Sequence, residues 1–227
     1  MTFINTELPY NVYIGGVGVE GNKIEINGLS IIELKEGNIV KQALKANGSA
    51  NCISGDVEFY VSGAQKSPVT FVGFDTTEKS KAKVYVGDGT TETTLNSLYL
   101  QNLDEVIVAN KATLNLAEVS YSGGNNTNRL FYNVNNLTIH EGGTLDLTNV
   151  NTTYSDSILG NYTGGGTLRL EDGKAFTIGG TASGTTTVEI DGTPVVDQTY
   201  ITVTGGGTES FTYDSDEYEL RNDEASA

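Results

Sequence analysis

Three stretches of the chain have the same apolar pattern at equal spacing: Val106-Ile107-Val108, Leu137-Thr138-Ile139 and Leu168-Arg169-Leu170. A second set follows them at Leu114-Asn115-Leu116, Leu145-Asp146-Leu147 and Phe176-Thr177-Ile178. Both sets advance by one constant step, from 106 to 137 to 168 and from 114 to 145 to 176. Apolar residues at alternate positions indicate a strand with one buried face. The stretches therefore predict short strands in a repeating unit of constant length.

Short strands that return at a constant step predict a coiled chain. Each strand then lies about 4.8 Å from its counterpart in the next repeat, and the sheets enclose a narrow apolar interior. Asn102, Asn133 and Asn161 are expected at equivalent corners, where stacked amides satisfy backbone groups. The sequence predicts an all-β, right-handed, single-stranded parallel β-helix with three strands per coil and irregular terminal caps.

The repeat divides the chain into three regions. Residues 1–56 are interpreted as an N-terminal cap with the first strands, 57–190 as the β-helix coils, and 191–227 as a C-terminal cap and polar tail. Caps are expected because the open ends of a β-helix expose strand edges. Within the first region, residues 36–45 are the only stretch that could form a short capping helix.

Composition restricts the partners and the location. The 29 acidic and 13 basic residues give a net charge of −16, so nucleic acid is a poor partner. No stretch approaches the ~20 apolar residues of a membrane span, which argues against membrane insertion. Cys52 is the single cysteine, which excludes an intramolecular disulfide framework. We expect an extracellular or bacterial cell-surface location, as part of a longer chain, because Met1 is followed directly by Thr2-Phe3-Ile4 and residues 221–227 read as a polar linker.

Two segments carry a family resemblance. Residues 142–147, Gly-Gly-Thr-Leu-Asp-Leu, and residues 165–178, which begin Gly-Gly-Thr-Leu-Arg-Leu, resemble the repeats of autotransporter passenger domains and related surface adhesins of the pectate-lyase-like β-helix superfamily. The resemblance covers about residues 95–190. It implies a parallel β-helix fold. Adhesins, polysaccharide lyases, glycoside hydrolases and phage tailspikes all occur in this group, so the resemblance leaves the activity open.

An outward stripe of apolar and aromatic residues is the first candidate site. If Leu100, Phe131 and Leu159 point inward, alternation turns four residues outward: Tyr99, Leu130, Tyr132 and Ile158. Such a stripe often marks a surface covered by a sugar chain or a neighbouring protein. The alternative is that residues 121–128 and 152–156 fold back over it.

A tight corner is the second candidate site. His140, the sole histidine, and Glu141 precede two glycines, and one coil later the chain reads Glu171-Asp172-Gly173-Lys174. Stacking would bring Glu141 near Asp172, which predicts either a calcium site of oxygen ligands or an acid/base pair. The alternative is a solvated turn in which glycine adopts positive φ. No other cofactor is expected.

The outward side chains bear on catalysis. Asp146 and Arg169 are the one acidic and the one basic residue among six outward positions, and the repeat places them on different sheets. A β-helix hydrolase or lyase needs grouped carboxylates. We therefore expect a non-catalytic structural or adhesive module that presents a sheet face or loops to a carbohydrate or to a host or bacterial surface protein. The alternative is a carbohydrate-active β-helix, either a polysaccharide lyase or a glycoside hydrolase.

Overall fold

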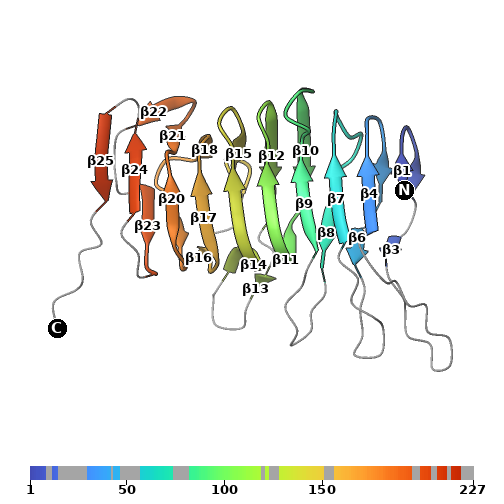
Figure 1. Ribbon diagram of the computed structural model, residues 1–227, viewed down its shortest axis with the longest axis horizontal. Helices are drawn as coiled ribbons and strands as arrows, with labels where there is room; N and C mark the ends of the chain where they lie inside the picture. Colours follow the sequence, from blue (N-terminus) through green and yellow to red (C-terminus); the bar gives the residue numbers. More distant parts are fainter. Residues whose placement is uncertain are drawn as a thin grey trace.

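The computed structural model describes the following residues: 1–8, 12–14, 30–41, 43–46, 57–73, 82–118, 121–122, 128–150, 156–195, 200–205, 209–213 and 216–220. This part of the chain is all β, without an α-helix, and its strands lie side by side along the long axis of the molecule (Figure 1). Most neighbouring strands are parallel and far apart in sequence. This architecture is compatible with a parallel β-helix.

Parallel pairing forms two rows within a 15-stranded sheet, and a separate sheet has six strands. The first row joins β3 (Val12–Ile14), β6 (Ala43–Ala46), β8 (Thr70–Val72), β11 (Leu100–Val108), β14 (Asn128–Ile139), β16 (Asp156–Ile158), β19 (Phe176–Ile178) and β23 (Ile201–Val203). The second row joins β1 (Thr2–Phe3), β4 (Ser30–Leu34), β7 (Val57–Val61), β9 (Lys83–Val86), β11, β14, β17 (Asn161–Gly164) and β20 (Ala182–Gly184). The six-stranded sheet contains β10 (Thr93–Ser97), β12 (Ala112–Leu116), β15 (Thr144–Asp146), β18 (Thr167–Leu170), β21 (Thr187–Ile190) and the antiparallel β22 (Thr193–Val195).

The remaining strands form short local pairs. They are β2 (Glu7–Leu8) with β5 (Ile39–Val40), β13 (Tyr121–Ser122) antiparallel to β14, and β24 (Glu209–Tyr213) antiparallel to β25 (Asp216–Leu220). The stretch 36–45, the only candidate for a capping helix, holds β5 and the start of β6 instead. Asn38 lies fully buried there and donates from Nδ2 to Oε1 of Gln65 at 3.1 Å. This side-chain bond ties the segment to its neighbour in place of helical bonds.

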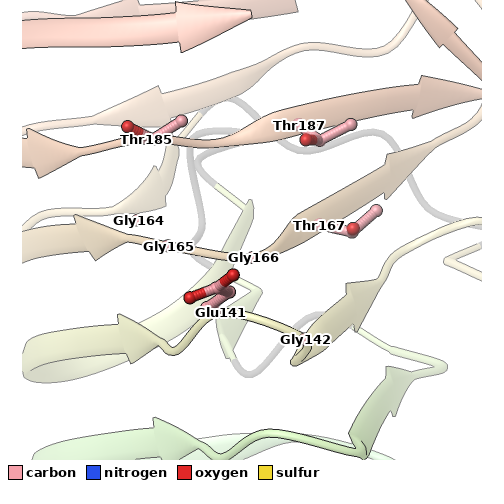
Figure 2. A pocket seen from close by; sticks show the side chains of 8 residues that line it. All are labelled: Glu141, Gly142, Gly164, Gly165, Gly166, Thr167, Thr185 and Thr187. Carbon is pink, nitrogen blue, oxygen red and sulfur yellow. The ribbon is translucent and has the colours of Figure 1, made fainter. Parts of the chain in front are cut away.

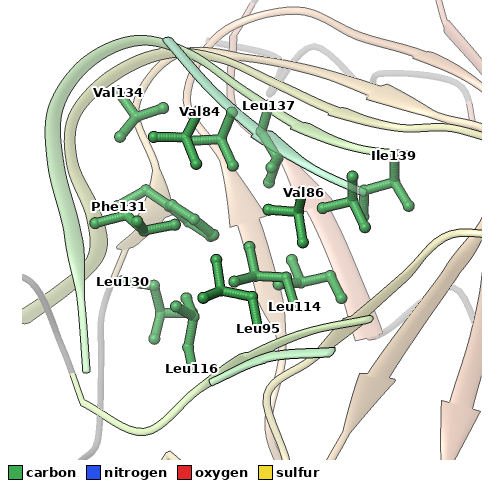
Figure 3. Close-up of a cluster of buried hydrophobic side chains, with 14 of the residues drawn as sticks. Val84, Val86, Leu95, Leu114, Leu116, Leu130, Phe131, Val134, Leu137 and Ile139 are labelled. Carbon is green, nitrogen blue, oxygen red and sulfur yellow. The ribbon is translucent and has the colours of Figure 1, made fainter. Parts of the chain in front are cut away.

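The apolar interior is built from the alternate residues of these strands. Leu95, Leu114, Leu145 and Leu168 follow one another in register across the six-stranded sheet, and all four are fully buried. Figure 3 shows Leu95, Leu114 and Leu116 facing valines and leucines of the 15-stranded sheet. Each buried leucine stabilises the fold by about 1.5–3 kcal/mol relative to exposure. The predicted stacking of Leu114 and Leu145 is confirmed.

Two asparagines explain how one strand serves two rows. Asn102 and Asn133 have φ angles of 57° and 52°, a left-handed conformation that asparagine adopts more readily than most residues. β11 and β14 bend there, so their first residues pair in one row and their last residues in the other. The Nδ2 of Asn133 donates to Oδ1 of Asn102 at 3.1 Å, as the amide stacking predicted. Asn161 does not join them, because it pairs with Asn136.

The register of the third predicted repeat is wrong. Leu168 lies opposite Leu145, not Leu137, so the step between these two levels is shorter than the constant step that the sequence predicts. Phe176 accordingly pairs with Ile201 in the first row and does not stack on Leu145. Any apolar triplet satisfies any of the sheets equally well, so alternation alone does not identify the partner strand. Fewer residues separate Leu145 from Leu168 than separate Leu114 from Leu145, and the strands remain parallel.

Candidate functional site

The outer face of the six-stranded sheet carries a row of five threonines in direct register. We call Thr94, Thr113, Thr144, Thr167 and Thr187 the threonine row. Each precedes a buried leucine or valine, so alternation turns its side chain outward. Thr94 is exposed and the other four are half-buried. With adjacent parallel strands about 4.8 Å apart, the row is about 19 Å long.

A second outward row runs beside the first. Asn96, Asn115, Asp146, Arg169 and Glu189 form this polar row. The Nδ2 of Asn115 donates to Oδ1 of Asn96 at 2.7 Å, and Nε of Arg169 donates to Oε2 of Glu189 at 2.7 Å. Arg169 also lies 3.9 Å from Asp146. The prediction that Asp146 and Arg169 occupy different sheets is therefore wrong, and Arg169 offsets the charge of one of the two carboxylates in this row.

A groove opens where the corner leading into the six-stranded sheet becomes shorter. Four residues, 140–143, separate Ile139 from Thr144, whereas two residues, 165–166, separate Gly164 from Thr167. Two residues, 185–186, likewise separate Gly184 from Thr187. The longer corner therefore projects beyond the shorter ones that follow it and leaves a step in the surface.

The groove has a volume of about 610 Å³ and a polar lining. Figure 2 shows the side chains of Glu141, Thr167, Thr185 and Thr187 around backbone contributed by four glycines, Gly142 and Gly164 to Gly166. A methyl group on Gly166 would collide with the carbonyl oxygens of Gly143 and His140. Close backbone packing thus requires glycine in the floor, and Thr167 and Thr187 continue the lining into the threonine row.

The predicted outward stripe is formed only in part. Leu130 and Ile158 are buried, at 0% and 1% exposure, so the premise that they face outward is wrong. Ile158 pairs with Phe131 and is the inward residue, whereas Leu159 is 47% exposed. Alternation also fails at Leu130, which lies among the core side chains of Figure 3. Tyr99 and Tyr132 are half-exposed, and the guanidinium of Arg129 lies 5.9 Å from the ring centre of Tyr132.

Glu141 and Asp172 do not come together. Glu141 precedes β15 and Asp172 follows β18. Because these two strands are parallel neighbours, the two residues lie at opposite ends of the strands. Gly165 takes the place next to Glu141, because a Cβ built there lies 3.1 Å from the Glu141 nitrogen. Among the residues described by the structure, no three His, Cys, Asp or Glu side chains are grouped in a way that could hold a metal ion. The predicted calcium pair is therefore not formed, and Glu141 lines the groove.

The second row of the large sheet carries a cluster that the sequence interpretation missed. Lys83 lies opposite both Glu58 and Glu105 in register, and its Nζ donates to Oε2 of Glu105 at 3.1 Å and lies 4.0 Å from Asp104. The hydrogen bond to Glu105 raises the pKa of Lys83. On the neighbouring positions the rings of Tyr60 and Tyr85 stack with centroids 4.4 Å apart.

The tyrosine pair is held in its neutral form. Burial and the hydrogen bond from Tyr60 to the Glu58 carboxylate, 2.8 Å long, raise the pKa of Tyr60 well above its ordinary value of 10.0. Burial also raises the pKa of Tyr85. The two rings are stacked almost parallel, with an interplanar angle of 2°.

The threonine row could have been found from the sequence. Thr-Leu-x-Leu occurs at 113–116, 144–147 and 167–170, and twice it follows Gly-Gly. Aligning the segments on the threonine, and not on a constant step, gives the observed register.

Comparisons with known proteins add no relative. No family profile, no curated protein and no solved structure matches the chain. The residues that the structure describes include no helix with the length and apolar character needed to cross a membrane.

Proposed function

We propose that the chain is a non-catalytic structural or adhesive module of a bacterial cell-surface or secreted protein, and that its threonine row binds carbohydrate. The module is a right-handed, single-stranded parallel β-helix with three strands per coil. The single observation that carries the proposal is the register of the five threonines across five neighbouring strands.

The row offers chemistry that suits a polyhydroxylated ligand. Each threonine hydroxyl both donates and accepts hydrogen bonds, as sugar hydroxyls do. The spacing of about 4.8 Å repeats along the face, so a chain of repeating units can make the same contact several times. The polar row next to it offers amides and an internally paired Arg169, which add hydrogen-bonding groups without a strong charge.

The parallel pairing supports the structural part of the proposal. Strands of the second row pair from Thr2 at the N-terminal end to Gly184, with backbone bonds between successive levels. In such a stack each coil contacts only the coils before and after it, and together the coils form a long, stiff body. A stiff body that displays a regular face is suited to contact between a cell surface and an extended glycan.

Retention on immobilised glycans tests the binding function. We expect the protein to be retained by at least one member of a panel of plant and host polysaccharides, without release of sugar. The double variant Thr113→Val, Thr144→Val keeps the shape of both side chains and removes two hydroxyls, and it should lose most of the retention. The matched control is Thr177→Val, on the first row. Equal retention of the protein and the double variant would refute the role of the row.

One observation favours a second candidate, a polysaccharide lyase or glycoside hydrolase. Lys83 lies within 4.0 Å of two carboxylates, those of Asp104 and Glu105. A lyase would be expected to carry such a basic residue beside acidic ones. The raised pKa of Lys83 keeps it protonated, whereas a general base must be free to accept a proton near neutral pH. Release of unsaturated or reducing sugars from the same panel, abolished by Lys83→Met, would establish the enzyme and overturn our preference.

A further inference from the structure

We propose that the groove at the 164–166 corner is the specificity subsite of this module, and that it binds one or two residues of a neutral polysaccharide through Glu141. The inference rests on the proposed function and names the part of the face that selects the ligand. The groove adjoins the threonine row, because Thr167 and Thr187 belong to both.

The size of the groove sets the size of the ligand. Ligand sites in proteins typically have volumes of about 300–1,000 Å³. The groove, at about 610 Å³, therefore accommodates a short stretch of a sugar chain and not a folded partner. The floor is backbone and the walls are hydroxyls, so the site offers no apolar platform for a lipid or an aromatic ligand.

The charge of the groove sets the class of sugar. Glu141 is the only ionisable residue in the lining, and it is exposed. A carboxylate accepts hydrogen bonds from two neighbouring sugar hydroxyls, and bonds to a charged acceptor are about twice as strong as neutral ones. The same carboxylate and the net charge of −16 repel uronates and sulfated sugars. We therefore assign the groove to neutral hexose or pentose polymers.

The groove is also preformed. Thr167 N donates to Gly143 O at 2.9 Å and Thr187 N donates to Gly166 O at 3.0 Å, so the floor is fixed by the backbone bonds of the sheet. A fixed floor avoids the entropy cost of ordering a loop on binding. Glu141 is the one long side chain in the lining, and this makes it the residue whose replacement should change selectivity most.

Affinity measured on the full chain tests the assignment. Galactomannan and soluble β-glucan serve as neutral probes, and polygalacturonate and heparin as anionic ones. Glu141→Gln keeps the shape and removes the charge, and we expect it to weaken binding of the neutral probe by about tenfold. Thr185→Val should weaken binding several-fold. Glu171→Gln, at an exposed turn outside the groove, is the matched control and should change binding less than twofold.

The outcomes separate the subsite from the function. If the protein binds a neutral glycan and Glu141→Gln binds equally well, the subsite is refuted while the carbohydrate-binding function stands. If only anionic glycans bind, the assigned sugar class is wrong. If the protein binds no glycan at all, the proposed function fails and the subsite fails with it. Thermal unfolding of each variant should match that of the parent, because Glu141, Glu171 and Thr185 are exposed.

Discussion

Truncating two leucines in one stack gives a direct measure of the register. Leu145 and Leu168 are fully buried and lie opposite each other on adjacent strands. Leu→Ala at such sites costs about 2–5 kcal/mol, from lost burial and a residual cavity. Because the two side chains are neighbours, the first truncation already removes part of what the second would lose. We expect the double variant to be less destabilised than the sum of the singles by about 1 kcal/mol, within the usual range of about 0.5–3 kcal/mol for contacting residues.

The assay is urea denaturation followed by far-ultraviolet circular dichroism and by tyrosine fluorescence, since the chain has 12 Tyr and no Trp. The control cycle combines Leu145→Ala with Val61→Ala. Val61 lies on β7, three strands before β14 in the second row, and β14 leads into β15, the strand of Leu145. The two sites are therefore about 14 Å apart along the axis. Distant sites add to within about 0.5 kcal/mol. A coupling between Leu145 and Leu168 no larger than that of the control would refute the pairing of β15 with β18.

Three further perturbations follow from the same packing. Leu147→Asp places an unpaired charge at a site with 2% exposure and should abolish cooperative unfolding by circular dichroism, whereas Asn149→Asp, on the exposed turn, should not. Gly166→Ala should cost about 1–3 kcal/mol in urea denaturation, because the added methyl group meets carbonyl oxygens; a cost below that of Thr167→Ala would contradict the tight floor. Because the raised pKa of Tyr60 keeps it protonated when folded while the unfolded chain ionises near its ordinary value of 10.0, stability should be complete below that pH and fall above it; Tyr60→Phe should flatten this decline in Tm.

Alternation in the sequence is enough to identify strands and inward residues where the strands are straight. Leu114, Leu116, Leu145 and Leu147 are all buried as expected, because a period of two allows one orientation once a face is apolar. The same rule fails at Leu130 and Ile158, where adjacent strand positions do not keep the assumed phase. Where two apolar residues are adjacent, the sequence does not show which of them faces inward.

The partner of each strand is harder to obtain, because it depends on how many residues each corner uses. The step between paired residues is 25 from Leu137 to Tyr162 and 23 from Leu145 to Leu168, so the shorter connection after β14 and the shorter corner before Thr167 together move every later strand by one sheet. The candidate site is defined by these partners: the threonine row, the Asp146–Arg169–Glu189 contacts and the groove all arise from the register. If the number of residues per repeat is assumed to be constant, strands are assigned to the wrong partners, and outward residues that are neighbours in the structure are not recognised as such.

Variable spacing along the six-stranded sheet has a consequence for protein engineering. Successive levels of the sheet are occupied by Leu95, Leu114, Leu145, Leu168 and Val188, and the steps between their positions in the sequence are unequal. Insertions are thus absorbed by connections while the packed layers keep their spacing. The turn at Gly173, where added atoms meet open space, is a natural point at which to graft a foreign epitope for display.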